Sequence, residues 1–235
     1  MTGNARLDWR RGKTMARRPL RGGHARSSDV LHSQTEDGGL VAFDFDGTLT
    51  TRDSFTAFLR WRVDRARYRK GLLRLAPAAL AYLFHRDRGR IKAAAVREFL
   101  AGVLRADLET EARVFAQAMA PQLLRPDAVL TWRRWRSERA KLVIVTASPE
   151  LLVAPFARGL GADLLIGTAL AFDADDRVTG VLGGPNCRGP EKVRRLREVF
   201  GPEVRLTAAY GDTSGDTEML AIADEPGYRV FKERP

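Results

Sequence analysis

The chain has little of what secreted and membrane-spanning proteins need. Its 235 residues include one cysteine, Cys187, which cannot form an internal disulfide, so the sequence is compatible with the cytoplasm. No apolar run follows the arginines near the N-terminus, and we therefore expect no signal peptide. The uncharged run at residues 75–84 is much shorter than the roughly 20 apolar residues that cross a bilayer. These absences favour a cytoplasmic protein.

Acidic residues are also scarce relative to basic ones. The 29 Asp and Glu are outnumbered by 40 Lys and Arg, which gives a formal net charge of +11. The excess is concentrated between residues 60 and 105, where thirteen Lys or Arg accompany three acidic residues. Residues 1–37 are rich in Arg, Gly and Ser and have no apolar run, so we expect a disordered basic N-terminal arm there. This charge distribution favours an anionic partner.

The most informative segment is a short apolar strand that ends in two carboxylates and a glycine. Residues 40–50 read Leu-Val-Ala-Phe-Asp-Phe-Asp-Gly-Thr-Leu-Thr. Asp44 and Asp46 are two positions apart, so both side chains project from the same face of an extended backbone. Burying two unpaired anions is costly, but a divalent cation between them removes that cost, and Gly47 allows a turn that leaves room for a phosphate. The segment indicates a phosphoryl-transfer site.

Three further segments place polar groups at strand ends or helix starts. They are residues 142–148 (Leu-Val-Ile-Val-Thr-Ala-Ser), the pair Glu191-Lys192, and residues 210–216 (Tyr-Gly-Asp-Thr-Ser-Gly-Asp). A calcium loop of the helix-loop-helix type would need regularly spaced oxygen ligands and a glutamate at its twelfth position, which do not follow Asp44. The four segments in this order favour phosphoryl transfer over calcium binding.

The alternation of strand and helix patterns predicts the fold. Strand patterns at about 39–45, 141–146, 162–167 and 205–210 alternate with helical patterns at 127–138, 149–159, 189–200 and 214–223. This order predicts an α/β fold with a doubly wound parallel sheet, a late edge strand at 228–231 and a β-hairpin at 170–181. Ligands bind beyond the carboxyl ends of such strands, where Asp44, Thr146 and Asp212 fall.

A long insertion with helical spacing follows the first strand. We expect residues 54–125 to form a helical cap, and residues 38–53 and 126–235 to form the catalytic core. A cap in this position can close over the site, exclude water and select the substrate.

The four segments together resemble the haloacid dehalogenase superfamily of phosphohydrolases. That superfamily carries an Asp-x-Asp-Gly-Thr motif, a Ser or Thr at the second strand end, a Lys and a Gly-Asp-x-x-x-Asp motif, all of which occur here in order. The resemblance covers roughly residues 38–231 and implies a Rossmann-like fold with phosphatase activity. The position of the cap is that of subclass IB, which includes phosphoserine phosphatases, and there Asp53 falls where an acidic residue often contacts the substrate.

The chemistry of the motif residues fits this resemblance. Asp44 is the expected nucleophile, which would form an aspartyl-phosphate, and Asp46 is the expected acid and base. We expect Mg2+ to be the cofactor, held by the Asp44 carboxylate, the Asp46 main-chain carbonyl and the Asp212 carboxylate.

Other polar residues are expected to bind the phosphoryl group. Thr146, the adjacent Ala147 and Lys192 would contact the phosphoryl oxygens, where charge must be neutralised before an anion can attack. Asp216 is expected to support the site by holding Lys192 or a metal-bound water.

Each of these residues also has a purely structural interpretation. Thr146 can cap a strand end, Lys192 can be a solvated helix residue, and Asp212 and Asp216 can cap the last helix. Ser148 would be the N-cap of the next helix with Pro149 at its first position, and Asp53 would be an N-cap for a helix near Ser54.

The cap sharpens the prediction of the substrate. Residues 186–193, residues 145–150 and the basic apolar cap resemble the phosphatidylglycerophosphatase C family, which removes the terminal phosphate of phosphatidylglycerophosphate and whose cap carries a longer hydrophobic segment. We therefore expect a phosphate monoester substrate with an anionic phospholipid head group, and peripheral contact of the cap with the inner face of the membrane.

Other functions stay open at this point. The cap charges can simply be solvated, and the substrate can be a soluble ester such as phosphoserine or a sugar phosphate. Phosphate transfer to another hydroxyl, or a non-enzymatic basic protein that binds membrane or nucleic acid, are further alternatives. Because Asp44, Asp46, Lys192 and Asp212 are all intact, we expect an enzyme and no nucleic-acid partner.

Overall fold

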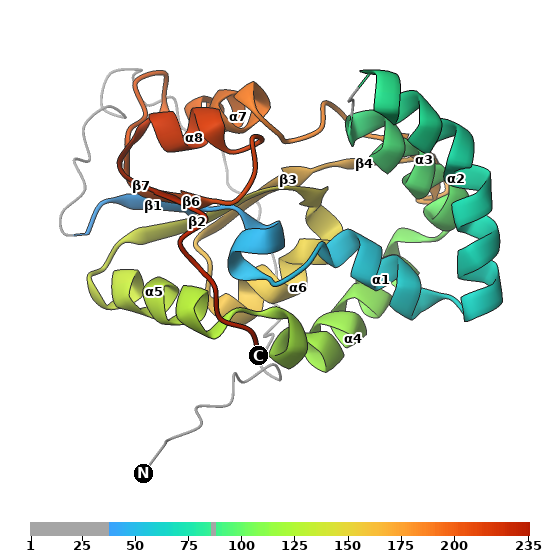
Figure 1. Ribbon diagram of the computed structural model, residues 1–235, viewed down its shortest axis with the longest axis horizontal. Helices are drawn as coiled ribbons and strands as arrows, with labels where there is room; N and C mark the ends of the chain where they lie inside the picture. The colour runs from blue at the N-terminus through green and yellow to red at the C-terminus, as the bar shows by residue number, and fades with distance from the viewer. Residues whose placement is uncertain (1–37, 86–87) are drawn as a thin grey trace, which may run out of the picture.

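A five-stranded parallel sheet lies at the centre of the computed structural model, which describes residues 38–85 and 88–235 (Figure 1). The predicted N-terminal arm lies outside the described residues. The strand order is β3 (Leu164–Thr168), β2 (Lys141–Pro149), β1 (Leu40–Phe43), β6 (Leu206–Gly211) and β7 (Ala223–Tyr228), and every neighbouring pair is parallel. The predicted doubly wound α/β fold is confirmed.

Helices cover both faces of this sheet. Helices α5 (Pro126–Ser137) and α6 (Glu150–Leu160) lie on one face, and α7 (Pro190–Phe200) and α8 (Thr217–Ala221) lie on the other (Figure 1). The pleat of β1 sends Val41 and Phe43 into the core cluster of the first face and Ala42 into that of the second. The first strand is therefore apolar throughout because it is buried on both sides.

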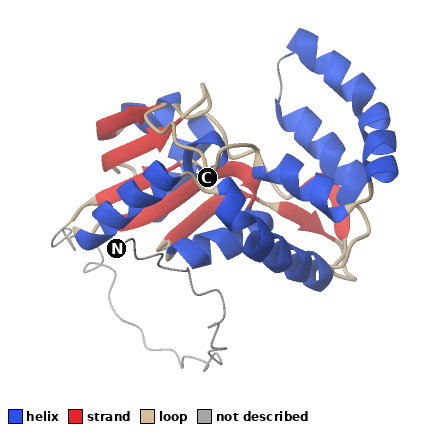
Figure 2. Ribbon diagram, turned by 60° about the horizontal axis from the view of Figure 1, so that its bottom comes forward, coloured by secondary structure: helices blue, strands red, loops and turns tan. Residues whose placement is uncertain are grey.

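The described part of the insertion at residues 54–125 contains four α-helices. They are α1 (Ser54–Arg62), α2 (Arg65–His85), α3 (Arg88–Leu100) and α4 (Arg105–Leu123), and α2 and α3 stand side by side away from the sheet (Figure 2). The close contact of α2 with α3 depends on Gly71, since a Cβ there would lie 2.2 Å from Cζ of Phe99. None of the helices among the described residues is both long and apolar enough to cross a bilayer.

The predicted β-hairpin is confirmed, and its packing against the helical insertion is an addition to the prediction. Strands β4 (Leu170–Phe172) and β5 (Val178–Leu182) pair antiparallel. The amide of Gly102, just after α3, donates to the carbonyl of Val178, and the Val178 amide donates to the carbonyl of Val103. The hairpin from the second half of the chain therefore supports α3.

Two predicted elements near the C-terminus need correction. The late strand is Ala223–Tyr228 and not 228–231, and the preceding helix spans only Thr217–Ala221 and not 214–223. Residues 213–216 form a turn in which the Asp216 amide donates to the Thr213 carbonyl, which delays the helix start. This late strand, β7, includes Pro226, which is tolerated because β7 is an edge strand and one of its sides needs no amide donor.

An aromatic cluster fixes β1 against α5 and the end of the chain. Phe43 is fully buried, and its ring centroid lies 5.0 Å from that of Trp132, 4.6 Å from that of Tyr210 and 6.4 Å from that of Phe231. The Trp135 indole N–H donates to the Tyr210 hydroxyl at 2.9 Å, so the cluster leaves no polar group of these two rings unpaired. Since Asp44 follows Phe43 directly, this packing sets the direction in which the strand ends.

We expect Phe43→Ala to lower the free energy of unfolding by about 3–5 kcal/mol, because the cavity left by the ring cannot collapse between three aromatic neighbours. Urea denaturation followed by tryptophan fluorescence measures this loss. Leu130→Ala on the exposed side of α5, where the leucine is 61% exposed, is the matched control and should change stability by no more than about 0.5 kcal/mol. A loss below about 1 kcal/mol for Phe43→Ala would contradict the assignment of Phe43 to the core.

Candidate active site

The carboxyl ends of β1, β2 and β6 meet at one edge of the sheet, beside a cavity of about 680 Å³. Asp44 follows β1, and its amide donates to the Tyr210 carbonyl on β6 at 2.9 Å. Asp46, Asp53, Ala147, Lys192, Asp212 and Asp216 line the same cavity. The structure therefore brings together most of the side chains that the sequence selected.

A single buried ammonium group connects three parts of this site. Nζ of Lys192, on α7, lies 2.6 Å from Oδ1 of Asp44, 2.7 Å from Oδ1 of Asp216 and 2.6 Å from the carbonyl oxygen of Val145. Its side chain is 1% exposed. Burial opposes the charged form, but Asp44 and Asp216 outweigh it and raise the pKa of Lys192. The solvated interpretation of Lys192 is wrong, because all three ammonium protons have buried partners.

Asp216 supports the loop after β6. Its Oδ2 accepts hydrogen bonds from the amides of Asp212 and Thr213, at 3.2 and 2.9 Å. Although burial raises the pKa of Asp216, Lys192 and the donors of Thr213 lower it overall. Gly211 makes this turn possible, since a Cβ there would lie 2.4 Å from Cβ of Asp216. The fourth motif is thus a loop that is fixed by hydrogen bonds to Asp216 and that places Asp212 at the cavity.

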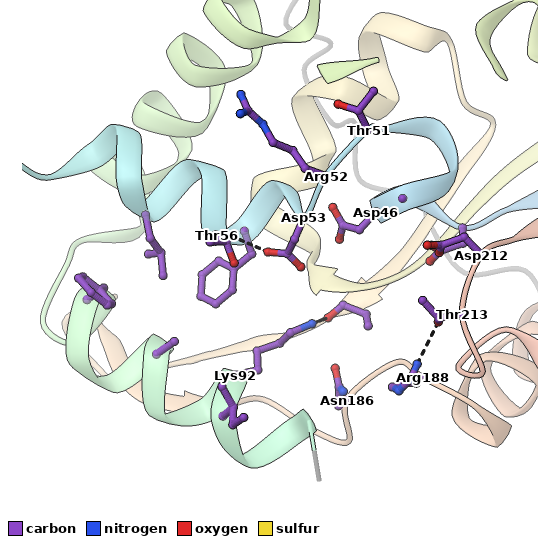
Figure 3. Close-up of a pocket in the computed structure, with 18 of the residues that line it drawn as sticks. Asp46, Thr51, Arg52, Asp53, Thr56, Lys92, Asn186, Arg188, Asp212 and Thr213 are labelled. Carbon is purple, nitrogen blue, oxygen red and sulfur yellow. Dashed lines mark hydrogen bonds between the residues drawn. The ribbon is translucent and has the colours of Figure 1, made fainter. Parts of the chain in front are cut away.

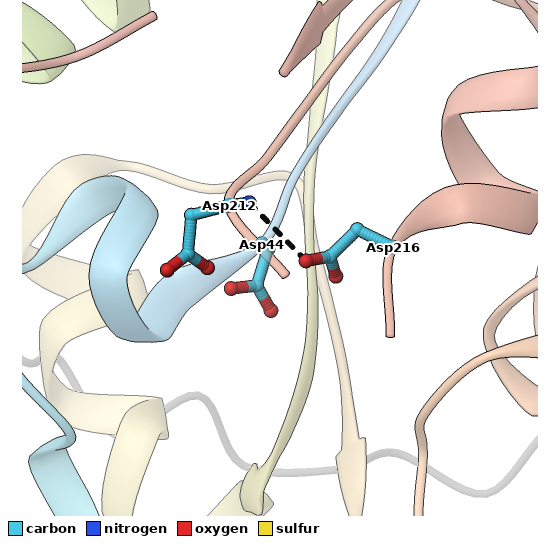
Figure 4. A group of neighbouring side chains, drawn as sticks. All are labelled: Asp44, Asp212 and Asp216. Atoms are coloured by element: carbon cyan, nitrogen blue, oxygen red, sulfur yellow. Dashed lines mark hydrogen bonds between the residues drawn. The ribbon is translucent and has the colours of Figure 1, made fainter. Parts of the chain in front are cut away.

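The acidic residues fit a divalent cation. Asp44, Asp212 and Asp216 each offer a carboxylate oxygen, and these oxygens lie within 4.8 Å of one another (Figure 4). Oδ1 of Asp212 is buried without a hydrogen-bond partner, and burial with the nearby Asp216 charge raises the pKa of Asp212. Gly47 leaves the space beside it open, because a Cβ there would lie 2.2 Å from Oδ2 of Asp212. Oxygen-only ligands with an unpaired buried carboxylate are the donor set of Mg2+ or Ca2+.

The expected metal set and the observed cluster differ in one residue. The cluster contains Asp216 in place of Asp46. Both Asp216 oxygens already accept hydrogen bonds, one from Lys192 and the other from the loop amides, so Asp44 and Asp212 retain the free oxygens. The carboxylate of Asp46 points elsewhere, which is compatible with the prediction that only its main-chain carbonyl binds metal.

Asp46 is held by donors from two different segments. Its Oδ1 accepts from the Ser54 amide at 2.7 Å, and its Oδ2 accepts from the Ser148 hydroxyl. Burial, with a smaller contribution from the charge of Asp53, raises the pKa of Asp46 to about 6. The prediction that Ser148 caps a helix is wrong, since β2 continues to Pro149 and α6 begins at Glu150.

The remaining predicted site residues have local structural partners. Asp53 is the N-cap of α1, where it accepts from the Thr56 amide at 2.6 Å, so that interpretation is confirmed (Figure 3). It also lines the cavity, and its contact with a substrate stays a prediction. Thr146 is fully buried and its hydroxyl accepts from the Ser148 amide at 3.0 Å, while Ala147 and not Thr146 lines the cavity. The phosphate-binding role of Thr146 stays a prediction.

Lys92 is a site residue that the sequence did not reveal. It extends from α3 into the cavity, opposite Asp53 and Thr56, and its ammonium donates to the Ala147 carbonyl (Figure 3). Burial lowers the pKa of Lys92, although Asp46, Asp53 and Asp44 act in the opposite direction. Among thirteen cap cations nothing in the sequence distinguishes it, because its contact depends on where the helical insertion folds back.

The C-terminal segment is a second feature that was missed. Asp127 at the start of α5 accepts from the amides of Lys232 and Glu233, at 2.6 and 3.0 Å. Nε of Arg125 lies 3.2 Å from the carbonyl oxygen of Gly47, and Nε of Arg229 lies 2.6 Å from that of Asp212. Arginines near the end of the chain and in the loop before α5 therefore hold the two loops that carry the acidic motifs.

Comparisons with known proteins agree with this geometry. The family model of haloacid dehalogenase-like hydrolases matches residues 41–221. Protein CicA of Caulobacter vibrioides is 68% identical over 196 residues, which are 83% of this chain and 88% of that protein. An identity this high over most of both chains shows that the two proteins share a fold and a family.

Solved structures with lower identity share the fold. A protein of unknown function from Bordetella pertussis Tohama I matches with a TM-score of 0.66 and 23% identity, over 80% of this chain and 87% of that one. A substrate-bound phosphoserine phosphatase matches with a TM-score of 0.57 and 17% identity, over 83% of this chain and 87% of that one. At these identities the likeness establishes the arrangement of helices and strands.

We expect the metal-free protein to lose stability as the pH rises from about 4 to about 7. Burial raises the pKa of Asp44 from 3.8 to about 7, and a group with a raised pKa in the folded chain stabilises it below the unfolded pKa and loses that contribution as the pH approaches the folded one. Urea denaturation in the presence of a chelator at both pH values measures the fall. Asp44→Asn should show a smaller fall, and an equal one would contradict the shift.

Metal addition should reverse this loss. A ligand that binds only the folded chain raises the unfolding temperature, so Mg2+ at pH 7 should raise it more for the parent chain than for Asp212→Asn. Differential scanning fluorimetry across a Mg2+ titration measures both shifts. If Asp212→Asn responds to Mg2+ as the parent does, Asp212 is not a ligand.

Proposed function

Since the chain belongs to the haloacid dehalogenase-like hydrolase family, we propose that it is a Mg2+-dependent phosphomonoester hydrolase that works through an aspartyl-phosphate on Asp44. We propose further that the substrate carries an anionic lipid head group, such as phosphatidylglycerophosphate. The observation that carries the proposal is the contact of buried Lys192 with both Asp44 and Asp216, next to the unpaired oxygen of Asp212. A nucleophilic carboxylate, a fixed cation and an open metal ligand are the parts that phosphoryl transfer needs.

In the first step a carboxylate oxygen of Asp44 attacks phosphorus and the bond from phosphorus to the ester oxygen breaks. Asp46 donates its proton to that oxygen, so an alcohol leaves. In the second step Asp46 takes a proton from water, the water oxygen attacks phosphorus, and the bond to Asp44 breaks. Inorganic phosphate leaves and both carboxylates return to their starting state. The raised pKa of Asp46, about 6, suits a group that gives and takes a proton near neutral pH.

Lys192 positions the nucleophile before the reaction. Its three protons are all donated in the free enzyme, so it holds Asp44 in one orientation. As Asp44 attacks, the N–H group of Lys192 that donated to Asp44 becomes available to donate to a phosphoryl oxygen, where negative charge accumulates. When bound at Asp44, Asp212 and the Asp46 carbonyl, Mg2+ would supply further neutralisation of that charge. Ala147, which lines the cavity near the end of β2, would contact the phosphoryl group through its main chain, and Thr146 would need to turn its buried hydroxyl toward the cavity to do so.

Two of the structural neighbours support this chemistry by analogy. One is a substrate-bound phosphoserine phosphatase and another is a phospho-aspartyl intermediate analogue of phosphoserine phosphatase, with TM-scores of 0.57 and 0.54. Proteins of this fold therefore include phosphatases, one of them studied as an analogue of a phospho-aspartyl intermediate.

The preference for a lipid head group is supported by the outer face of the cap. Arg65, Arg69 and Lys70 are exposed on α2, and Leu80 on the same helix is 60% exposed. Arg67 and Arg74 are not available in the same way, because both form ion pairs with Glu98, at 2.6 and 3.2 Å. Exposed cations beside apolar side chains favour peripheral contact with an anionic membrane. The soluble substrates phosphoserine and sugar phosphates are the alternative outcome of the tests below.

We expect Asp44→Asn to abolish Mg2+-dependent phosphate release, because an amide cannot form the acyl-phosphate bond. Phosphate release is measured from phosphatidylglycerophosphate, lysophosphatidate, phosphoserine, sugar phosphates and p-nitrophenyl phosphate, with and without Mg2+. Circular dichroism serves as the control that the variant folds. Residual activity above a few per cent of the parent would contradict the assignment of the nucleophile.

Replacing the exposed cap cations Arg65, Arg69 and Lys70 by Gln should release the protein from anionic vesicles. Each cation contributes about 1 kcal/mol near such a surface, so three substitutions should weaken binding by roughly a hundredfold. Vesicle sedimentation measures binding, and the ratio of activity on a lipid phosphate in vesicles to activity on p-nitrophenyl phosphate should fall with it. Arg205→Gln, on the opposite end of the molecule from the cap, is the matched control. An unchanged ratio would favour a soluble substrate.

A further inference from the structure

The cavity at the active site has two chemically different halves. The sheet edge and the loops around it supply carboxylates and cations, as described above. The other half is formed by α1, α2 and α3, and its wall consists of Phe55, Leu59, Tyr68, Leu72, Leu75, Ile91, Ala95 and Phe99. Both halves belong to one cavity of about 680 Å³. Phosphate chemistry accounts for the first half and leaves the second unexplained.

The apolar half does not behave like the core of a helical bundle. Protein interiors are close-packed and leave few voids larger than a water molecule. Here Leu72 is 47% exposed, and Leu75 and Ile91 are only partly buried, although all three face the same cavity. Apolar side chains that line an open space of this size lack packing partners, which a ligand would supply.

The base of this half is closely packed, so the space above it is a property of the fold. Phe99 is 5% exposed and packs under α2, where Arg67 stacks on its ring at 5.0 Å and Tyr68 lies 5.8 Å from it between centroids. Gly71 brings α2 onto this ring, and the β4–β5 hairpin supports α3 from below. The wall therefore cannot collapse inward without displacing an aromatic ring that is held on several sides.

Lys92 lies at the boundary between the two halves. Its ammonium donates to the Ala147 carbonyl on the side of the carboxylates, while Ile91 and Ala95 on the same helix belong to the apolar wall. A ligand in this cavity thus passes from a polar site to an apolar one across the position of a single cation.

We propose that the apolar half binds the hydrocarbon chain of the substrate, so that the enzyme acts on amphiphilic phosphate monoesters with the chain inserted between α1, α2 and α3. This inference rests on the proposed phosphomonoesterase function and adds that substrate recognition extends beyond the head group. An amphiphilic phosphate ester matches the cavity because it has a polar end and an apolar end in one molecule, as the cavity has a polar half that adjoins an apolar half. In this proposal the hydrocarbon chain of the substrate leaves the bilayer and enters the cap. An enzyme that cleaves only the head group at the membrane surface would leave that hydrocarbon chain in the bilayer.

The test is the affinity of n-alkylphosphonates from ethyl to octyl, which carry a phosphate-like group that is not hydrolysed. Isothermal titration calorimetry of the full chain with Mg2+, below the critical micelle concentration, should show affinity rising about two- to fourfold per methylene. Since the two compounds differ by six methylenes, the octyl compound should bind at least about sixtyfold more tightly than the ethyl compound. Equal affinities would overturn the proposal.

Two adjacent leucines provide a matched pair of variants. Leu72 lines the cavity, whereas Leu73 is 75% exposed and does not line it. Leu72→Gln should reduce the gain between ethyl and octyl by at least threefold, and Leu73→Gln should leave the series as in the parent. Ala95→Phe, which fills the apolar half from α3, should bind the ethyl compound and lose most of the gain for octyl. If Leu72→Gln and Leu73→Gln have equal effects, the chain binds elsewhere and the proposal is wrong.

The outcomes separate this inference from the proposed function. If p-nitrophenyl phosphate is hydrolysed in an Asp44-dependent manner while affinity does not depend on chain length, the hydrolase stands and the chain site does not. If affinity rises with chain length and falls in Leu72→Gln while no phosphate ester is hydrolysed, the chain site stands and the hydrolase does not.

Discussion

The arrangement of the site depends on a buried ammonium that is shared by two carboxylates. Lys192 holds Asp44 from β1 and Asp216 from the loop after β6, and it is anchored to β2 through the Val145 carbonyl. An ion group of this kind is costly to bury unless its protons are donated and its charges are paired. All three Lys192 protons are donated, but one ammonium serves two carboxylates, and burial still raises the pKa of Asp44 to about 7. Three central strands are thereby tied at the edge where their side chains must cooperate, and the loop glycines leave room for the carboxylates.

The parts of this structure that could be read from the sequence are those that depend on local pattern. Apolar strands that end in Asp44 and Asp212 predicted both the parallel sheet and the edge at which the site forms. This was possible because the run of apolar residues in a strand and the polar residue that follows it can be recognised from neighbouring residues alone. The hairpin was predicted at residues 170–181 for the same reason, and the structure places it at 170–182. The assignments of Asp44, Lys192, Asp212 and Asp216 to one site followed from their place at strand ends and helix starts.

Contacts between distant segments could not be read in this way. Lys92 looks like any other cation of a basic helix until α3 folds over β2, and the tail at residues 229–233 shows no pattern that would place it on Asp127. The Ser-Pro pair at residues 148–149 resembled a helix start. In the structure the hydroxyl of Ser148 donates to Asp46 instead, and the pairing of Pro149 with Thr168 extends the strand. In each case a tertiary partner decided the outcome over the local preference.

The site is assembled from residues that lie far apart in the chain, which affects the order in which it can form during synthesis. Asp44 and Lys192 are separated by 148 residues, and Asp46 and Ser148 by 102. During synthesis the N-terminal strand leaves the ribosome long before its lysine, and a loop of this length must close before the ion group can form. The helices of the insertion contact one another locally and can form earlier. Until α7 and β6 have been synthesised, the first strand carries two acidic groups with no buried cation to pair with and lacks one of its two neighbouring strands, so the central sheet and its ion group form late relative to β1.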